Sequence, residues 1–304
     1  MKIWLTGAKG FTGRHFECIA QSAGHQVASL DADLTNPEAL KTQAQMLLDQ
    51  DGSPDAVVHL AALSFVGLDN PSAFFQVNAI GSLNLLQVLR DCRDRVVGFH
   101  PTVLMASSAN IYGNCSASPV SEQQMAAPLN HYAASKVAME AIAHVFMPEL
   151  PIVVVRPFNY TGPGQSQDFL VPKLVSHFRA RSPSIALGNL YVQREFNDVR
   201  WVCRVYLDLL LSGQASQTYN ICTGRTYAIS DVLEQLQQLT GHRPNVVQDP
   251  SLVRPNEPIR LSGDPTKLRD VLRASGGGLS QTSWDEASLR GPELTTVLAD
   301  MLAA

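Results

Sequence analysis

The sequence predicts an α/β fold in which helices cover both faces of a parallel, doubly wound sheet. Three observations lead to this prediction. Short apolar runs alternate with segments of helical length and pattern through about residue 160. A glycine-rich turn from Gly7 to Gly13 separates the first apolar run from the first helical segment. The run at 55–60 is almost continuously apolar, as expected for a strand that is covered on both faces.

The glycine turn is the first candidate site. Residues 2–6 form a β-type run, and a helical pattern follows the turn to about residue 23. Glycines let the backbone approach a pyrophosphate, and a helix N-terminus offers it free N–H groups. The spacing is GxxGxxG, one residue off the GxGxxG form, and a turn without a ligand is the alternative. We interpret the segment as the dinucleotide-binding turn of a Rossmann-type domain, with these candidate contacts: Gly7, Gly10, Phe11, Thr12 and Gly13.

A second strand is predicted at 26–30 and is followed by two carboxylates, Asp31 and Asp33. A carboxylate about 20 residues beyond the glycines commonly binds the adenosine ribose of NAD. No Arg follows this strand to bind the 2′-phosphate of NADP, although Lys9 and Arg14 lie in the glycine turn. The sequence therefore leaves the choice between NAD and NADP open.

The next two strands bring further residues to the same edge of the sheet. The run at 55–60 ends in His59 and continues as Leu60-Ala61-Ala62, where small residues let a cofactor lie close. A long helix from 71 to about 91 carries Asn78. The strand at 102–106 leads to Ser107 and Ser108, and a strand at 152–155 leads to Asn159. Ligands of such sheets bind at the carboxyl ends of the strands.

Tyr132 and Lys136 stand four residues apart at the start of an Ala-rich helix that ends before Pro148. This spacing places both side chains on one helix face, one turn apart. A phenol has a pKa of about 10, and a nearby ammonium lowers that pKa toward neutrality. Such a pair exchanges a proton with a carbinol oxygen while a cofactor carries a hydride.

The pattern loosens after Gly164 and predicts a smaller C-terminal α/β lobe. Helices are expected near 171–181, 199–211, 230–240, 266–273 and 293–302, a strand near 218–222, and a surface loop at 275–283. We assign residues 1–160 and a returning segment, 198–223, to the dinucleotide-binding domain. Residues 161–197 and 224–304 form the substrate lobe.

Composition excludes several classes of function. The net charge is −4 without a basic stripe, which argues against a nucleic-acid partner. No apolar run reaches the 18 residues of a membrane span, and the first residues lead directly into a strand rather than a signal peptide. The five cysteines stand singly, without the spacing of metal ligands. We expect reduced thiols, no metal site and a cytoplasmic location.

Taken together and in order, four motifs resemble the extended short-chain dehydrogenase/reductase family over residues 1 to about 272. They are GxxGxxG, Ser-Ser-x-x-Ile-Tyr-Gly, Tyr-x-x-x-Lys and Arg-Pro-Phe-Asn. The resemblance implies a catalytic group of Ser108, Tyr132 and Lys136, with Ser107 as the second choice for the hydroxyl. It also implies NAD or NADP as cofactor and a homodimer formed through the helices at 71–91 and 132–147. Asp33-Leu34 resembles the family's pair beside the adenine, so Asp31 becomes the preferred ribose ligand.

The second lobe resembles enzymes that act on GDP-mannose derivatives. The segments concerned are 156–165, 169–172 with Val171, 194–199 and 254–267. The resemblance implies a GDP-linked sugar as substrate, with Arg194 and Arg254 at the diphosphate. Glu257 would accept from guanine or ribose, and Asn159 would anchor the hexose or the near phosphate.

The implied reaction is the NAD(P)H-dependent reduction of the C4 ketone of a nucleotide-linked 4-keto-6-deoxyhexose. A 4-epimerase of a GDP or UDP sugar is the first alternative, and a non-catalytic dinucleotide-binding sensor is the second. Dehydratases of this group place a Glu two residues after the catalytic hydroxyl, where this chain has Asn110. The segment around Trp284 does not match the usual family ending.

Overall fold

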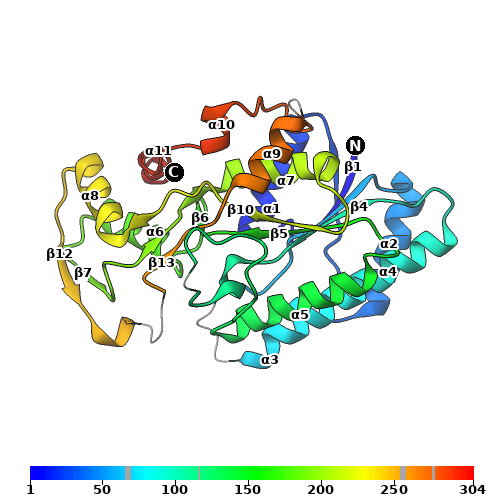
Figure 1. The fold of residues 1–304 in the computed structure, drawn as a ribbon, viewed down its shortest axis with the longest axis horizontal. Coiled ribbons are helices and arrows are strands. Elements are labelled where there is room, and N and C mark those ends of the chain that lie inside the picture. The colour runs from blue at the N-terminus through cyan, green and yellow to red at the C-terminus, as the bar shows by residue number, and fades with distance from the viewer. Residues whose placement is uncertain (66–69, 116, 254–257, 276–277) are drawn as a thin grey trace.

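A computed structural model describes residues 1–65, 70–115, 117–253, 258–275 and 278–304 (Figure 1). Its centre is a six-stranded parallel sheet in the order β10-β5-β4-β3-β1-β2. The strands are β1 (Lys2–Thr6), β2 (Gln26–Ser29), β3 (Ala56–His59), β4 (Thr102–Ala106), β5 (Ile152–Pro157) and β10 (Gln217–Ile221). The order of the strands reverses between β1 and β3, the position at which ligands of doubly wound sheets bind.

Helices cover both faces of the sheet, which confirms the predicted fold class. On one face lie α1 (Phe11–Ser22), α7 (Val199–Ser212) and α9 (Thr266–Ala274), around an apolar core that includes Leu5 and Val155. On the other face lie α2 (Pro37–Asp51), α4 (Gly81–Arg95) and α5 (His131–Phe146), around a second core that includes Trp4 and Val154. Neighbouring residues of each strand point to opposite faces, so every central strand contributes to both cores.

The helix predicted from 71 to 91 differs from the regular helix that was expected. It begins as α3 (Pro71–Phe74), widens into a π-helical turn, η1 (Phe75–Ile80), and continues as α4 to Arg95. π-Turns are rare and occur mostly as single-turn bulges inside α-helices. Here the side chain of Asn78 bonds to both backbone groups of Leu63 and to Ser135. These are tertiary contacts, which helical periodicity does not show.

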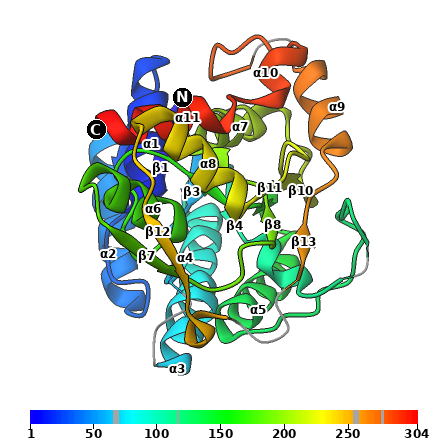
Figure 2. The same cartoon turned by 90° about the vertical axis from the view of Figure 1, so that its left-hand side faces the viewer.

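The second lobe is built around α6 (Leu170–Arg179), α8 (Ile229–Thr240) and α11 (Leu294–Ala303), which share one apolar core (Figure 2). Short strands complete it, and the sequence predicted none of them. They are β6 (Tyr160–Thr161), β7 (Ser184–Leu187), β8 (Gln193–Arg194), β9 (Asn197–Asp198), β11 (Tyr227–Ala228), β12 (Asn245–Gln248) and β13 (Arg260–Leu261). Short 3₁₀ turns, η2 (Ala109–Tyr112) and η3 (Pro250–Leu252), and a short helix, α10 (Glu286–Arg290), connect the larger elements. Strands of two residues carry no periodic signal.

Part of the predicted surface loop at 275–283 is anchored to the sheet-side helix α7. The buried carboxylate of Asp208 accepts from the backbone N–H and hydroxyl of Ser280 and from the indole N–H of Trp284. α9 also packs on α7 and β10, whereas α11 packs on α6 and α8. The assignment of all of 224–304 to the substrate lobe stays a proposal. In the described part of the chain, no helix is both long enough and apolar enough to cross a membrane.

The Asp208 contact predicts a large effect of a small substitution. In Asp208→Asn the amide keeps one acceptor oxygen and turns an N–H group toward donors. Hydrogen bonds to charged groups contribute about 1.5–3 kcal/mol, so we expect the free energy of unfolding to fall by about 2–3 kcal/mol. Urea unfolding measures this change, and Asp270→Asn on the exposed side of α9 is the control. Equal midpoints for the two variants would contradict the assignment.

Candidate active site

The structure brings Ser108 and Tyr132 together. Ser108 follows β4 and caps the 3₁₀ turn η2, where its Oγ accepts from the backbone N–H of Asn110 at 3.2 Å. Tyr132 is the second residue of α5, whose N-cap is Asn130, with its side chain accepting from the backbone N–H of Ala133. Both side chains are buried, and the Ser108 hydroxyl lies close enough to Tyr132 to favour the phenolate and lower the pKa of Tyr132. Ser107, the second choice, is also buried, but its Oγ has no hydrogen-bond partner among the described residues.

Lys136 lies one turn beyond Tyr132 and is buried against β4. Its Nζ donates to the carbonyl oxygen of Ala106, the last residue of that strand, at 2.7 Å. Burial lowers the pKa of Lys136 to about 8, while the nearby Glu140 carboxylate opposes that shift. The side chain therefore remains mainly cationic at neutral pH.

The pKa of Tyr132 moves in the direction opposite to the one expected from the Tyr-Lys spacing. Burial raises it above the usual value of 10, and the hydrogen bond from Ser108 offsets only part of this rise. The reason is that the ammonium of Lys136 bonds to the Ala106 carbonyl instead of the phenol oxygen. Tyr132 is thus held as a protonated phenol, the form that donates a proton to an oxygen developing negative charge.

The glycine turn requires its glycines. Gly7 has a φ of +73°, and a Cβ there would lie 2.7 Å from the backbone nitrogen of Ala61. A Cβ on Gly13 would lie 2.1 Å from the carbonyl oxygen of Gly7. The N-cap of α1, Gly10, has no side-chain cap, so the first N–H groups of the helix remain available to a phosphate. Leu60 and Ala62 flank Ala61 and are also half-buried at this edge.

Phe11 and Thr12 of the glycine turn both contact Tyr160 of β6. Phe11 stacks on the ring of Tyr160 with 6.2 Å between centroids. The hydroxyl groups of Thr12 and Tyr160 lie 2.8 Å apart. The backbone of the turn is therefore fixed before any ligand binds, which suits a preorganised pyrophosphate site.

The two carboxylates after β2 differ in their surroundings. Asp31 accepts from the Ser29 hydroxyl and forms an ion pair of 2.9 Å with Lys9, and these contacts lower its pKa. Asp33 bonds to the hydroxyl and backbone N–H of Thr35, which also lowers its pKa. Both are ionised at neutral pH and can accept from ribose hydroxyls. Leu34 is buried in the core between α2 and α4.

The structure places the predicted substrate residues in different surroundings, and two of them fall outside the described residues. Asn159 is exposed after β5, and Arg194 is half-buried on β8, between β11 and β13. Val171 lies in the apolar core of the lobe. Arg254 and Glu257 fall outside the described residues. The substrate assignments therefore stay predictions.

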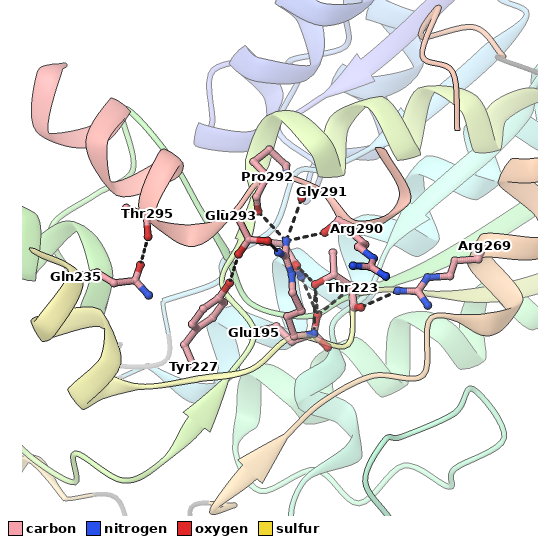
Figure 3. A network of polar contacts seen from close by, with 12 residues as sticks. Glu195, Thr223, Tyr227, Gln235, Arg269, Arg290, Gly291, Pro292, Glu293 and Thr295 are labelled. Carbon is pink, nitrogen blue, oxygen red and sulfur yellow. Dashed lines mark hydrogen bonds and ion pairs between the residues drawn. The ribbon is translucent and has the colours of Figure 1, made fainter. Parts of the chain in front are cut away.

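Glu195, which the sequence did not single out, forms a set of polar contacts between the lobe and the end of the sheet (Figure 3). Its buried carboxylate accepts from the backbone N–H groups of Thr223 at 2.9 Å, Gly263 at 2.8 Å and Gly224 at 3.3 Å. It also accepts from the side chain of Asn197 at 3.1 Å. The contact holds β8, and with it the neighbouring Arg194, beside the end of β10. Only the tertiary structure reveals this role.

These features define a class. A glycine turn at the switch point of a parallel sheet, with a buried Ser-Tyr pair and a Lys one turn away, is the arrangement of NAD(P)-dependent enzymes of the epimerase/dehydratase superfamily. The chain belongs to the family described as GDP-mannose 4,6 dehydratase, whose family model matches residues 12–273. The predicted family and enzyme class are confirmed, and so is NAD or NADP as the cofactor.

Two curated relatives and two solved structures show how close the similarity is. The chain is 37% identical to a GDP-6-deoxy-D-talose 4-dehydrogenase of Aggregatibacter actinomycetemcomitans, over 90% of this chain and 91% of the relative. It is 32% identical to the GDP-6-deoxy-D-mannose reductase of Pseudomonas aeruginosa, over 89% and 90%. A putative epimerase from Burkholderia cenocepacia superposes with a TM-score of 0.85 at 38% identity, over 99% and 97% of the chains. RMD from Pseudomonas aeruginosa complexed with NADPH superposes with a TM-score of 0.83 at 30% identity, over 99% and 96%.

The geometry predicts that Tyr132→Phe keeps cofactor binding and loses turnover. General acid catalysis contributes roughly 10²- to 10⁴-fold, so kcat should fall by about that factor. The matched control is Tyr219→Phe, which removes a buried hydroxyl that accepts from Gln214 and belongs to β10. Cofactor titration and steady-state kinetics measure both effects. Turnover of the Tyr132→Phe variant at a rate close to that of the control would refute the role of Tyr132.

Proposed function

We propose that the protein reduces the C4 ketone of GDP-4-keto-6-deoxy-D-mannose with NADH or NADPH. The observation that carries the proposal is geometric: the buried hydroxyl groups of Ser108 and Tyr132 lie at the carboxyl edge of the sheet, with the buried Lys136 one helical turn away. A reductase needs a proton donor at the ketone oxygen. A protonated phenol is such a donor, and its pKa does not have to be lowered before the hydride arrives. The names of the two curated relatives support the substrate.

Each residue has a defined part in this reaction. The bound cofactor supplies the hydride. Tyr132 donates its phenolic proton to the carbinol oxygen, while the Ser108 hydroxyl donates a hydrogen bond to the same oxygen. The ammonium of Lys136 fixes α5 through the Ala106 carbonyl and would hold the nicotinamide ribose. The glycine turn holds the cofactor's pyrophosphate, and Asp31 accepts from the adenosine ribose.

The two relatives leave two candidate products. 6-Deoxy-D-talose and 6-deoxy-D-mannose differ only in configuration at C4, so oxidation of either gives the same ketone. Hydride delivery to opposite faces of that ketone gives the two hexoses. The 37% identity with the talose dehydrogenase and the 32% identity with the mannose reductase make both products candidates. The homodimer through the helices at 71–91 and 132–147 and the cytoplasmic location stay predictions.

Product analysis tests this proposal. GDP-4-keto-6-deoxy-D-mannose and the protein should consume one NADH or NADPH per sugar, and NMR of the hexose should show one of the two C4 configurations. The matched control is the dTDP-linked 4-keto-6-deoxy sugar, which should react more slowly. Interconversion of C4 epimers without external cofactor would instead support a 4-epimerase, and epimerase is the activity named for the Burkholderia protein.

Asn110 predicts that the protein does not carry out the dehydration that would form its own substrate. Its side chain stands two residues after Ser108, where dehydratases of this group have a Glu, and an amide cannot remove the C5 proton. GDP-mannose incubated with the protein and oxidised cofactor should remain unchanged by chromatography. Accumulation of the 4-keto-6-deoxy sugar under these conditions would show that another base acts.

A further inference from the structure

A chain of buried hydrogen bonds crosses the sheet beneath the glycine turn. Thr6 ends β1 and His59 ends β3, and 2.7 Å separates Oγ1 of the first from Nδ1 of the second. The other ring nitrogen of His59, Nε2, lies 2.8 Å from Oγ of Ser82 on α4. The exposed fractions are 0% for Thr6, 2% for His59 and 0% for Ser82. Because water does not reach these groups, they depend on one another for hydrogen bonds.

The chain has a single direction. The Ser82 hydroxyl donates to the carbonyl oxygen of Asn78 at 2.7 Å, which uses its only proton. Nε2 of His59 must then carry a hydrogen and donate to Ser82. Burial, reinforced by the charge of Lys136, lowers the pKa of His59 to about 3, so the neutral ring offers Nδ1 as an acceptor. The Thr6 hydroxyl donates to Nδ1 and accepts from the backbone N–H of Ala61 at 3.2 Å.

The two ends of this chain reach the two halves of the active site. At one end, the backbone of Ala61 is the surface against which Gly7 packs without a Cβ. At the other end, Asn78 belongs to the π-turn and donates to the Ser135 hydroxyl at 2.9 Å. Ser135 in turn donates to the backbone carbonyl of Tyr132 at 2.7 Å. Hydrogen bonds that pass through Asn78 therefore connect Ala61, against which the cofactor turn packs, to the catalytic helix.

We propose that His59 is a positioning residue that fixes the glycine turn and the Tyr132 helix relative to each other. Its neutral imidazole presents an acceptor on one side and a donor on the other, which matches the direction of the chain. The expected effect of His59 on cofactor binding requires only that the protein binds NAD or NADP, as its family does. Only the turnover part rests on the proposed function.

Two substitutions break the chain at opposite ends. In His59→Asn, Oδ1 replaces Nδ1 and accepts from Thr6, but the side chain does not reach Ser82. In His59→Gln, Nε2 donates to Ser82, but no acceptor faces Thr6. The Asn variant should keep its cofactor affinity and lose kcat at saturating cofactor. The Gln variant should bind cofactor roughly 5- to 150-fold more weakly, the cost of an unpaired buried group. Calorimetric titration of NADH and NADPH without sugar and steady-state kinetics give the two readouts.

A second pair of variants keeps the test decisive if the His59 variants fold poorly. Thr6→Ser keeps the hydroxyl, whereas Thr6→Val keeps the shape and removes it. The Ser variant should retain wild-type cofactor affinity, and the Val variant should weaken it as His59→Gln does. Urea unfolding of every variant separates this effect from stability. Proportional losses of affinity, kcat and stability in both His59 variants, or equal affinities for the two Thr6 variants, would overturn the inference. Cofactor titration decides this even if the keto sugar is not a substrate.

Discussion

The buried ammonium of Lys136 is the interaction on which the active site depends. Because it donates to the carbonyl of Ala106, it fixes α5 against the end of β4. Ser108 lies two residues beyond that carbonyl, and Tyr132 lies one turn before Lys136, so the same contact places the two hydroxyl groups together. A buried charge is costly unless hydrogen bonds satisfy it. The contact therefore restricts α5 to a narrow range of positions. Because the ammonium bonds to Ala106 and not to the phenol oxygen, it does not lower the pKa of Tyr132.

Other buried polar groups fix the surroundings of this contact in a similar way. His59 joins the ends of β1 and β3 to α4, and Glu195 joins the second lobe to the end of β10. Asp208 holds the segment that leads to the C-terminal helix. Each group is satisfied by several donors or acceptors, so each specifies one arrangement of its partners. Such preorganisation allows a site to stabilise developing charge without rearrangement at the moment of reaction.

The local sequence patterns predicted the central strands and the glycine turn, because short stretches of sequence determine these elements. The alternation of strands and helices predicted all six central strands to within two residues at each end, and the glycine spacing predicted the turn after β1. The motifs placed Ser108, Tyr132 and Lys136, which the fold then brings to one edge. The two-residue strands of the lobe, the π-turn around Asn78 and the Glu195 contacts depend on partners that are distant in sequence. The predicted direction of the Tyr132 pKa shift was wrong for the same reason, because burial and the Ala106 carbonyl decide it.

The central claim is that hydride passes once from the cofactor to C4 of the hexose while Tyr132 protonates the oxygen. The most direct test uses reduced cofactor that carries deuterium at the transferring position of the nicotinamide, with GDP-4-keto-6-deoxy-D-mannose as substrate. Mass spectrometry and NMR of the product locate the label. The account predicts one deuterium at C4 of every hexose formed, in a single configuration, for each cofactor oxidised. Turnover that yields both C4 epimers without any deuterium at C4 would contradict it.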